Sequence, residues 1–243
     1  MTRRADVIAA ANLSEDGRMA AASPGPGFPD VLVSMWSTIR PSACARVADL
    51  GAGLGGASWW MQRQGAIVTA IEEQQECVSA GSRLFPHLEW QCAPIAEVDL
   101  SGFDGVTMFG LLSLEACPMT TLSAVLTKIW RGKRDCWVCI IDLFATGPAV
   151  TTTRNHFVMR AQLHDAAEGW TVRESRELNL DEQRSSWHDV GASIDVAVRM
   201  TTDDEVAKVV DDDHRVLSEL IESGAVRPGL IVLEPNAGRT LQT

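Results

Sequence analysis

Short apolar runs alternate with stretches of helical periodicity through the middle of the chain. The apolar runs predict buried strands, at Arg46–Leu50, Ala66–Ile71, Leu88–Cys92, Gly105–Phe109 and Cys136–Leu143. The stretches between them predict helices, at Gly55–Gln64, Glu73–Phe85 and Met119–Trp130. Strands and helices that alternate at this density are typical of an α/β fold, with a doubly wound, mostly parallel sheet covered by helices on both faces.

The pattern is less regular on either side of this region. Residues 1–28 are small, polar and punctuated by proline and glycine, which predicts a flexible N-terminal arm that adds little to the core. The further elements that we expect are helices at Asp30–Arg40 and Asn155–Glu168 and strands at Trp170–Leu178 and Leu230–Leu233. The two additional strands bring the expected sheet to seven.

The segment before the final strand gives two conflicting signals. Ser193–Val198 alternates like a strand, whereas Trp187, Val190, Ile194 and Val198 recur at helical spacing, and we favour a helix. A capping box at Thr202 and Glu205 opens a second helix, which Gly224 ends, before Pro228 and Gly229 turn the chain. We expect residues 29–243 to form a single domain in which residues 181–224 are a helical insertion covering a substrate site.

The charge balance excludes some classes of partner. The 243 residues include 21 Lys and Arg against 32 Asp and Glu, a net charge of -11. Such a chain is poorly suited to neutralise phosphates, so we expect no nucleic acid and no membrane partner. Because no apolar run approaches the roughly 20 residues of a membrane span, we expect a cytoplasmic protein. A homodimer remains open.

The six cysteines do not match a disulfide framework or a zinc pattern, and no metal site is expected. Cys136 and Cys139 form a CxxC motif within an expected strand. Because alternate residues of a strand point to opposite faces, these two thiols should be separated by the sheet. We therefore interpret them as buried structural thiols rather than a redox pair.

A glycine-rich loop carries the clearest chemical signal. It follows the strand at Arg46–Leu50 and precedes the helix at Gly55–Gln64. Gly51 and Gly53 allow a tight turn and close approach of a ligand, and the amides at the helix start favour a polar or anionic group. With Gly56 these glycines also satisfy the GxGxxG fingerprint of dinucleotide sites, so glycines alone do not select the cofactor.

Two acidic residues beside the loop bear on which cofactor it binds. Asp49 precedes the first glycine by two residues, where its carboxylate would repel a pyrophosphate but accept hydrogen bonds from an ammonium group. Glu72 ends the second expected strand, where a carboxylate can accept hydrogen bonds from ribose hydroxyls. Asp49 therefore favours a zwitterionic ligand, whereas Glu72 suits both a dinucleotide and S-adenosylmethionine.

These residues resemble the class I S-adenosylmethionine-dependent methyltransferases, in particular the branch that acts on small amines and related metabolites. The similarity lies in four motifs, at Asp49–Gly55, Val68–Glu72, Phe103–Val106 and Cys136–Phe144. It covers about Ala45 to Leu178, and the final strand is similar to the antiparallel seventh strand of the family. The resemblance implies a Rossmann-like methyltransferase fold and an S-adenosylmethionine cofactor that leaves as S-adenosylhomocysteine.

The resemblance also implies which residues contact the cofactor. The methionine part would lie at the glycine loop, the ribose at Glu72 and the adenine after the third strand. The implied cofactor residues are Asp49, Gly51, Ala52, Gly53, Glu72, Ala93, Pro94 and Phe109. The frequent acidic residue at the adenine position is missing here, and so is the histidine that many small-molecule members place after the fourth strand, where this chain has Leu112–Glu115.

Candidate acceptor residues lie where open α/β sheets bind ligands, in the loops after the strands, and in the insertion. Glu115 and His188 are the candidate catalytic residues, and Asp142, Trp187 and Trp36 are candidate substrate contacts. Each has an ordinary alternative: Glu115 as the exposed start of a helix, Asp142 bonded to a loop amide, the histidine at the surface, and the tryptophans in the core. His156 and His164, expected on one helix, are weaker candidates.

The sequence therefore predicts a methyltransferase that acts on a small-molecule acceptor, at nitrogen or oxygen. The missing histidine keeps open a protein of the same fold that binds the cofactor but serves as a partner subunit or catalyses another reaction. A nicotinamide-dependent oxidoreductase is the third hypothesis, disfavoured by Asp49.

Overall fold

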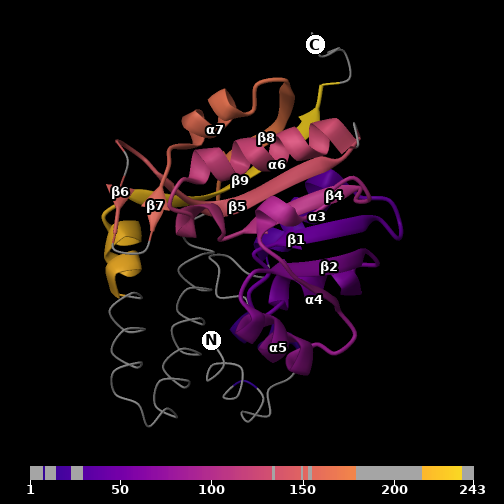
Figure 1. Ribbon diagram of the computed structural model, residues 1–243. Helices are drawn as coiled ribbons and strands as arrows, with labels where there is room; N and C mark the ends of the chain where they lie inside the picture. The colour runs from indigo at the N-terminus through magenta and orange to yellow at the C-terminus, as the bar shows by residue number, and fades with distance from the viewer. Residues whose placement is uncertain are drawn as a thin grey trace.

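The computed structural model describes residues 8, 15–22, 30–132, 135–148, 150–152, 155–178 and 215–236. They contain a seven-stranded sheet of order β3-β2-β1-β4-β5-β9-β8 (Figure 1). The strands are β1 Arg46–Leu50, β2 Ile67–Glu72, β3 Glu89–Cys92, β4 Gly105–Phe109, β5 Trp137–Ala145, β8 Trp170–Glu177 and β9 Val226–Pro235. Strands β1 to β5 pair in parallel, and β9 runs antiparallel to both of its neighbours. The predicted mostly parallel, doubly wound sheet is confirmed.

Helices cover both faces of this sheet (Figure 1). The helices are α2 Glu15–Ala22, α3 Asp30–Ile39, α4 Gly56–Arg63, α5 Gln75–Leu84, α6 Pro118–Gly132 and α7 Arg160–Ala166, with short 3-10 turns η1 Ile95–Glu97 and η2 Leu112–Leu114. Apolar residues of α2 to α5 share one core cluster with one face of the sheet, and those of α6 and α7 share a second cluster with the other face. Residues 215–222 are also helical.

The alternation within β5 separates the two cysteines of the CxxC motif as predicted. Cys136 belongs to the cluster under α6, and Cys139 belongs to the cluster under α3 and α4. Both are buried and neither forms a disulfide. They are therefore structural thiols on opposite sides of the sheet.

Pro228 and Gly229 do not turn the chain before a short final strand, as we expected. They lie inside β9, opposite Leu143 and Asp142 of β5. A Cβ placed on Gly229 would lie 2.8 Å from the ring of Phe144, so the glycine makes room for a neighbouring aromatic side chain. The pair acts as part of an antiparallel strand rather than as a turn.

The helix expected at Asn155–Glu168 is shorter than predicted. Its first residues instead form β7, His156–Phe157, which pairs with β6, Val150–Thr151. Phe157 is buried in a third cluster with residues of β5 and β9, and a strand lets it reach that cluster. The helix α7 begins at Arg160, and its first turn is capped by the side chain of Gln162, which accepts a hydrogen bond from the Met159 amide at 2.8 Å.

The N-terminal segment contributes more to the core than we expected. Met19, Ala21 and Ala22 of α2 are buried in the cluster that also contains α4. Two polar contacts join the same helices: Trp59 Nε1 donates to Glu15 at 2.7 Å, and Arg63 donates to Asp16 at 2.8 Å. α2 is thus packed on the helix that follows the glycine loop.

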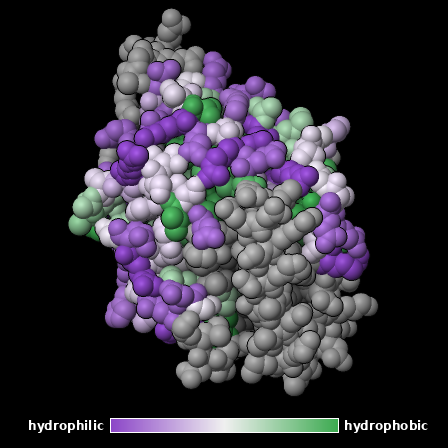
Figure 2. Space-filling view, turned by 180° about the vertical axis from the view of Figure 1, so that it is seen from behind, coloured by the Kyte–Doolittle hydropathy of each residue, from purple (hydrophilic) through white to green (hydrophobic). Residues whose placement is uncertain are grey.

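The described surface is mainly polar. In Figure 2 the described part of the face seen from behind is largely hydrophilic, and its hydrophobic areas are small. Among the described residues, the exposed large hydrophobic side chains are Val33, Ile67 and Leu114. Within the same residues, no helix combines the length and the apolar character needed to span a bilayer.

Candidate active site

The glycine loop joins the carboxyl end of β1 to the start of α4. Gly51, Gly53 and Gly55 have φ angles of 68°, 58° and 85°, in the left-handed region that favours glycine. A Cβ placed on Gly51 would also lie 2.6 Å from the side chain of Leu111, in the connection after β4. The loop therefore depends on glycine both for its dihedral angles and for its close packing.

Glu72 binds the loop from the end of β2. The Gly53 amide donates to one oxygen of its carboxylate and the Gln74 amide donates to the other, each at 3.0 Å. The side chain is 8% exposed, and each oxygen retains a second lone pair. Glu72 thus shapes the glycine loop and still offers acceptors at the carboxyl edge of the sheet.

Asp49 lies behind the same loop, 1% exposed. Ser58 Oγ donates to one oxygen of its carboxylate at 2.5 Å, and Thr107 Oγ1 donates to the other at 2.8 Å. Burial raises the pKa of Asp49 to about 6, with a smaller contribution from the negative charge of Glu72, while the two hydroxyl bonds act in the opposite direction. Sequence reasoning identified Asp49 but not its two partners.

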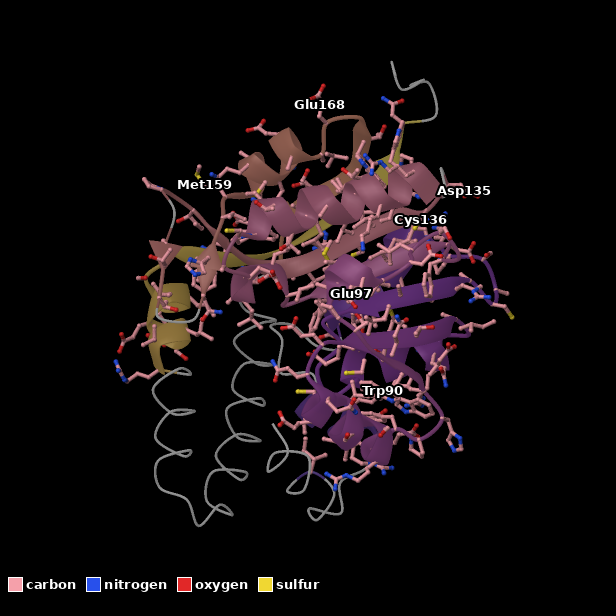
Figure 3. All side chains as sticks on the ribbon, in the orientation of Figure 1. Trp90, Glu97, Asp135, Cys136, Met159 and Glu168 are labelled. Atoms are coloured by element: carbon pink, nitrogen blue, oxygen red, sulfur yellow. The ribbon has the colours of Figure 1, made fainter. Side chains whose placement is uncertain are left out.

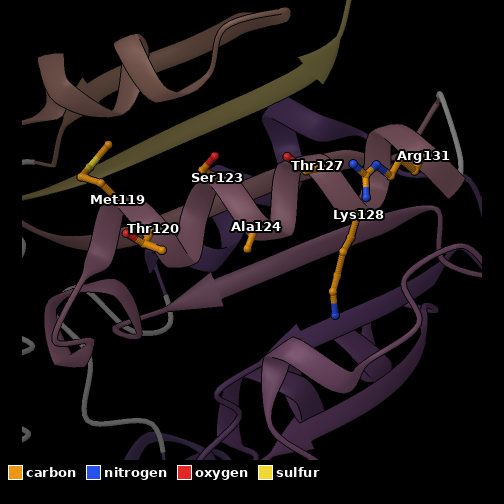
Figure 4. A pocket seen from close by; sticks show the side chains of 7 residues that line it. All are labelled: Met119, Thr120, Ser123, Ala124, Thr127, Lys128 and Arg131. Atoms are coloured by element: carbon orange, nitrogen blue, oxygen red, sulfur yellow. The ribbon is translucent and has the colours of Figure 1, made fainter. Parts of the chain in front are cut away.

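The connection after β3, where the resemblance implies adenine contacts, is held by a lysine of α6. The Ala93 amide donates to the Glu72 carbonyl at 3.2 Å, and Pro94 directly precedes η1. The ammonium of Lys128 donates to the carbonyls of Ile95, Ala96 and Val98. Figure 4 shows this side chain extending away from its helix. Sequence reasoning also missed Lys128.

Trp90 of β3 fixes the glycine loop from another side. A Cβ placed on Gly55 would lie 2.7 Å from the Trp90 ring, and one placed on Gly81 of α5 would lie 2.3 Å from it. Trp90 lies next to α5 in Figure 3. Gly55, the last residue of the loop, and Gly81 of α5 therefore make room for one indole, which packs against both.

Asp142 adopts the second of the two arrangements considered from the sequence. It lies in β5, 2% exposed, and accepts hydrogen bonds from the amides of Ser113 at 3.0 Å and Leu143 at 2.7 Å. Burial raises its pKa, while these bonds partly offset that effect. Asp142 therefore fixes the connection after β4, which carries the acceptor-side candidates.

Glu115 follows η2 at the start of the segment that leads into α6. It is partly buried, and Thr121 Oγ1 donates to its carboxylate at 2.8 Å. The preceding residue, Leu114, is 61% exposed. A carboxylate and an exposed apolar side chain thus stand together beyond the carboxyl end of β4. Phe109, the last residue of β4, packs against the core under α3 and α4.

The remaining candidates are dispersed. Trp36 of α3 packs edge to face against Trp60, with ring centroids 5.9 Å apart, beside the core. Trp187 and His188 lie outside the described residues. The two weaker histidines do not share a helix: His164 of α7 bonds Ser175 at 3.1 Å, whereas His156 is in β7, which packs beside η2.

Comparisons with known proteins place this geometry within a known architecture. No family model matches the chain, and neither does any curated protein. Solved structures do match. A methyltransferase from Geobacter sulfurreducens, in complex with S-adenosylhomocysteine, is 16% identical, with 88% of this chain and 93% of that one covered and a TM-score of 0.63. The cyclopropane synthase MmaA2 from Mycobacterium tuberculosis is 9% identical, with coverage of 92% and 94% and a TM-score of 0.71. The [4+2]-cyclase SpnF is 13% identical, with 88% of each chain covered and a TM-score of 0.67.

The chain has the class I methyltransferase fold. Within that fold, the glycine loop, Glu72, the connection after β3 and η2 all lie at the carboxyl edge of the parallel strands. Ligands of open α/β sheets bind at this edge, and the described cofactor candidates at the strand ends lie along it together with the turn that precedes Glu115.

Proposed function

We propose that the protein is an S-adenosylmethionine-dependent methyltransferase that acts on a small-molecule acceptor at nitrogen or oxygen, in the cytoplasm. The observation that carries the proposal is the pairing of Glu72 with Gly53. It joins an acidic acceptor at the end of β2 to the glycine loop at the end of β1. A nucleoside at this junction could donate hydrogen bonds from its ribose hydroxyls to the carboxylate and accept hydrogen bonds from the backbone amides of the loop.

The chemistry of the donor set fits this cofactor. Free lone pairs on Glu72 suit the two ribose hydroxyls, and the left-handed glycines leave the loop backbone accessible to the methionine part. Ala93 and Pro94 would contact the adenine, on a connection that Lys128 fixes. When bound, S-adenosylmethionine supplies an electrophilic methyl group on a sulfonium.

Asp49 disfavours a dinucleotide, whereas Glu72 suits the ribose of either cofactor. A pyrophosphate at the glycine loop would meet the negative charge of Asp49, which is buried behind that loop. A sulfonium and an ammonium would instead gain from that carboxylate. The electrostatics therefore favour a cationic nucleoside over a nicotinamide cofactor.

The acceptor would bind beyond the end of β4. Asp142 holds the Ser113 amide and thereby the turn that presents Glu115, whose carboxylate can accept a hydrogen bond from an amine or hydroxyl acceptor. Since the leaving group is already activated, orientation and desolvation of an unprotonated acceptor supply much of the acceleration. We propose that Glu115 orients the acceptor and that Trp187 and His188 of the insertion, together with Trp36, complete its site.

A second function deserves a test because the connection directly after β4, Leu112–Glu115, contains no histidine and Asp142 is engaged with a backbone amide. The same fold includes a [4+2]-cyclase and a cyclopropane synthase. In this alternative the protein binds the cofactor but catalyses another reaction or serves as a partner subunit.

Transfer of a labelled methyl group from S-adenosylmethionine to a panel of amines, phenols and alcohols tests the proposal. We expect labelled product with wild-type protein, loss of turnover in Glu72→Ala, and wild-type turnover in Glu76→Ala, which removes an exposed acid on α5. Glu115→Ala should raise the KM of the acceptor without weakening S-adenosylhomocysteine binding. Cofactor binding with no transfer to any acceptor would favour the second function.

A further inference from the structure

Three neighbouring strands present one row of side chains behind the glycine loop. Asp49 of β1 lies opposite Thr107 of β4, and Thr107 lies opposite Cys139 of β5. The row faces α3 and α4, because Cys139 belongs to the core cluster on that side. Ser58, in the first turn of α4, donates a hydrogen bond to the Asp49 carboxylate from the helix side of this row.

The Asp49 carboxylate has a donor on each of its oxygens, and the donors come from two different elements. Ser58 donates at 2.5 Å from the helix and Thr107 at 2.8 Å from the sheet. Asp49 is 1%, Ser58 0% and Thr107 3% exposed. A second acceptor for the Thr107 hydroxyl, the Ala48 carbonyl, is farther away at 3.5 Å, so the carboxylate is the stronger partner.

These contacts act directly on the loop. The loop is anchored at β1 before Gly51 and at α4 after Gly55, and the Asp49 carboxylate joins both anchors to β4. Loss of either hydroxyl would leave a buried anionic oxygen without its donor, which is costly in a site closed to water. The glycines between the two anchors have no side chains of their own to hold the loop.

We propose that Ser58 and Thr107 are positioning residues for the cofactor: their hydroxyls fix the Asp49 carboxylate between β1, β4 and α4, and this three-residue unit sets the affinity of the glycine loop for its ligand. The inference rests on the proposed cofactor. The two hydroxyls then influence ligand binding through Asp49, although both Ser58 and Thr107 are buried.

The charge state of Asp49 provides a readout that packing alone would not change. The titratable groups that face it are Glu72, whose charge raises its pKa, and the Cys139 thiol of β5, whose own pKa rises with burial and with the charges of Glu174 and Asp49. The hydroxyl bonds lower the pKa of Asp49, so removal of one donor should raise it. If the ionised unit is the binding form, ligand affinity declines as the pH falls through this pKa.

The test measures S-adenosylhomocysteine affinity by calorimetry between pH 5 and pH 8 in full-length protein. Thr107→Val removes the hydroxyl at nearly constant volume, Thr107→Ser restores it, and Ser58→Ala removes the other donor. Thr69→Val is the matched control, a buried threonine on β2 that does not bond Asp49. Denaturant unfolding of the unliganded variants at pH 5.5 and 7.5 accompanies the titrations.

We expect Thr107→Val and Ser58→Ala to weaken binding at pH 7.5 about fivefold or more, and to move the pH midpoint of affinity upward. Thr107→Ser should bind like the wild type, and Thr69→Val should keep the wild-type midpoint. Without ligand, Thr107→Val should lose more stability at pH 7.5 than at pH 5.5, whereas Thr69→Val should lose the same amount at both.

Wild-type affinity and midpoint in Thr107→Val would overturn the inference while leaving the cofactor intact. A loss of affinity in Thr107→Val that is equal at every pH and matched by Thr69→Val would also overturn it, because packing would then explain the effect. If wild-type protein fails to bind S-adenosylhomocysteine at any pH, the proposed function fails, and this inference fails with it.

Discussion

The carboxylate of Glu72 and the backbone amide of Gly53 are joined by a hydrogen bond of 3.0 Å, 19 residues apart in the chain. The other oxygen of Glu72 accepts from the Gln74 amide. One acidic side chain thus satisfies two backbone donors at the point where two strands end. The residue expected to bind ribose is also a structural part of the glycine loop.

Glu72→Gln should weaken the binding of S-adenosylhomocysteine more than the loss of one ribose contact would. A carboxamide has a single acceptor oxygen, so it cannot serve both the Gly53 and Gln74 amides, and its NH2 group would face an N–H donor. An unsatisfied amide costs about 1–3 kcal/mol when it is fully buried, and the partly buried bonds of Gly53 and Gln74 should cost less than that. Calorimetry checks this, with Glu76→Gln as control. Equal affinity of Glu72→Gln and wild type would remove the carboxylate from the loop.

Asp49 should make the protein less stable as the pH rises. Its pKa is about 6 in the folded state, above the usual value of 3.8, so the folded state holds the proton more tightly than the unfolded state. The free energy of unfolding should therefore fall between about pH 4 and pH 6, and this loss should be complete above pH 6. A pKa shift of this size corresponds to a change of about 3 kcal/mol in the free energy of unfolding.

Asp49→Asn isolates this contribution, because Asp142 has a raised pKa of its own that acts in the same direction. The difference in unfolding free energy between Asp49→Asn and wild type should move in favour of the variant as the pH rises from 4.5 to 7.5. Denaturant unfolding at four pH values measures it. A difference that stays constant over this range would contradict the burial of an ionisable Asp49.

Lys128→Met should weaken the binding of adenosine and of S-adenosylhomocysteine by the same factor, about threefold to tenfold. The ammonium bonds three carbonyls around η1, directly after Ala93 and Pro94, and a thioether cannot replace it. Arg131→Met is the control, since this exposed residue lies one turn further along the same helix. If both variants bind adenosine like wild type, Lys128 has no role in the adenine site.

Gly81→Ala should destabilise the protein by about 1–3 kcal/mol, because the added methyl would lie 2.3 Å from the Trp90 ring and 3.1 Å from the Leu54 carbonyl. Trp90→Phe shortens the side chain and should recover part of the loss in the double variant. Thermal unfolding measures both. Gly102→Ala, with no atom within 4 Å of the added carbon, should have a small effect. A Gly81→Ala variant as stable as Gly102→Ala would contradict the packing described.

The strands and helices of the sheet could be predicted because their signals are local. β1 and β4 have the predicted bounds, and the other central elements differ from prediction by a few residues. The exceptions depend on distant packing. Phe157 lies in a strand, where it packs into the cluster at the end of β5. Gly229 is inside β9, where the ring of Phe144 leaves no room for a Cβ.

The site follows the same division. Gly51, Gly53, Asp49 and Glu72 stand in a contiguous motif or at a strand end, so their positions could be predicted. Ser58, Thr107 and Lys128 could not, because the register of β4 against β1 and the packing of α6 on η1 bring them to the site. The residues on either side of Ser58, Thr107 and Lys128 form ordinary helix and strand patterns, with no motif that would mark these three positions.

Binding of the S-adenosyl nucleoside at the glycine loop and Glu72 is tested by a calorimetric titration with S-adenosylhomocysteine and NADH. We predict micromolar binding of S-adenosylhomocysteine to wild-type protein, loss of that binding in Glu72→Ala, and no binding of NADH. Binding of NADH alone, or S-adenosylhomocysteine binding that survives Glu72→Ala unchanged, would contradict the account.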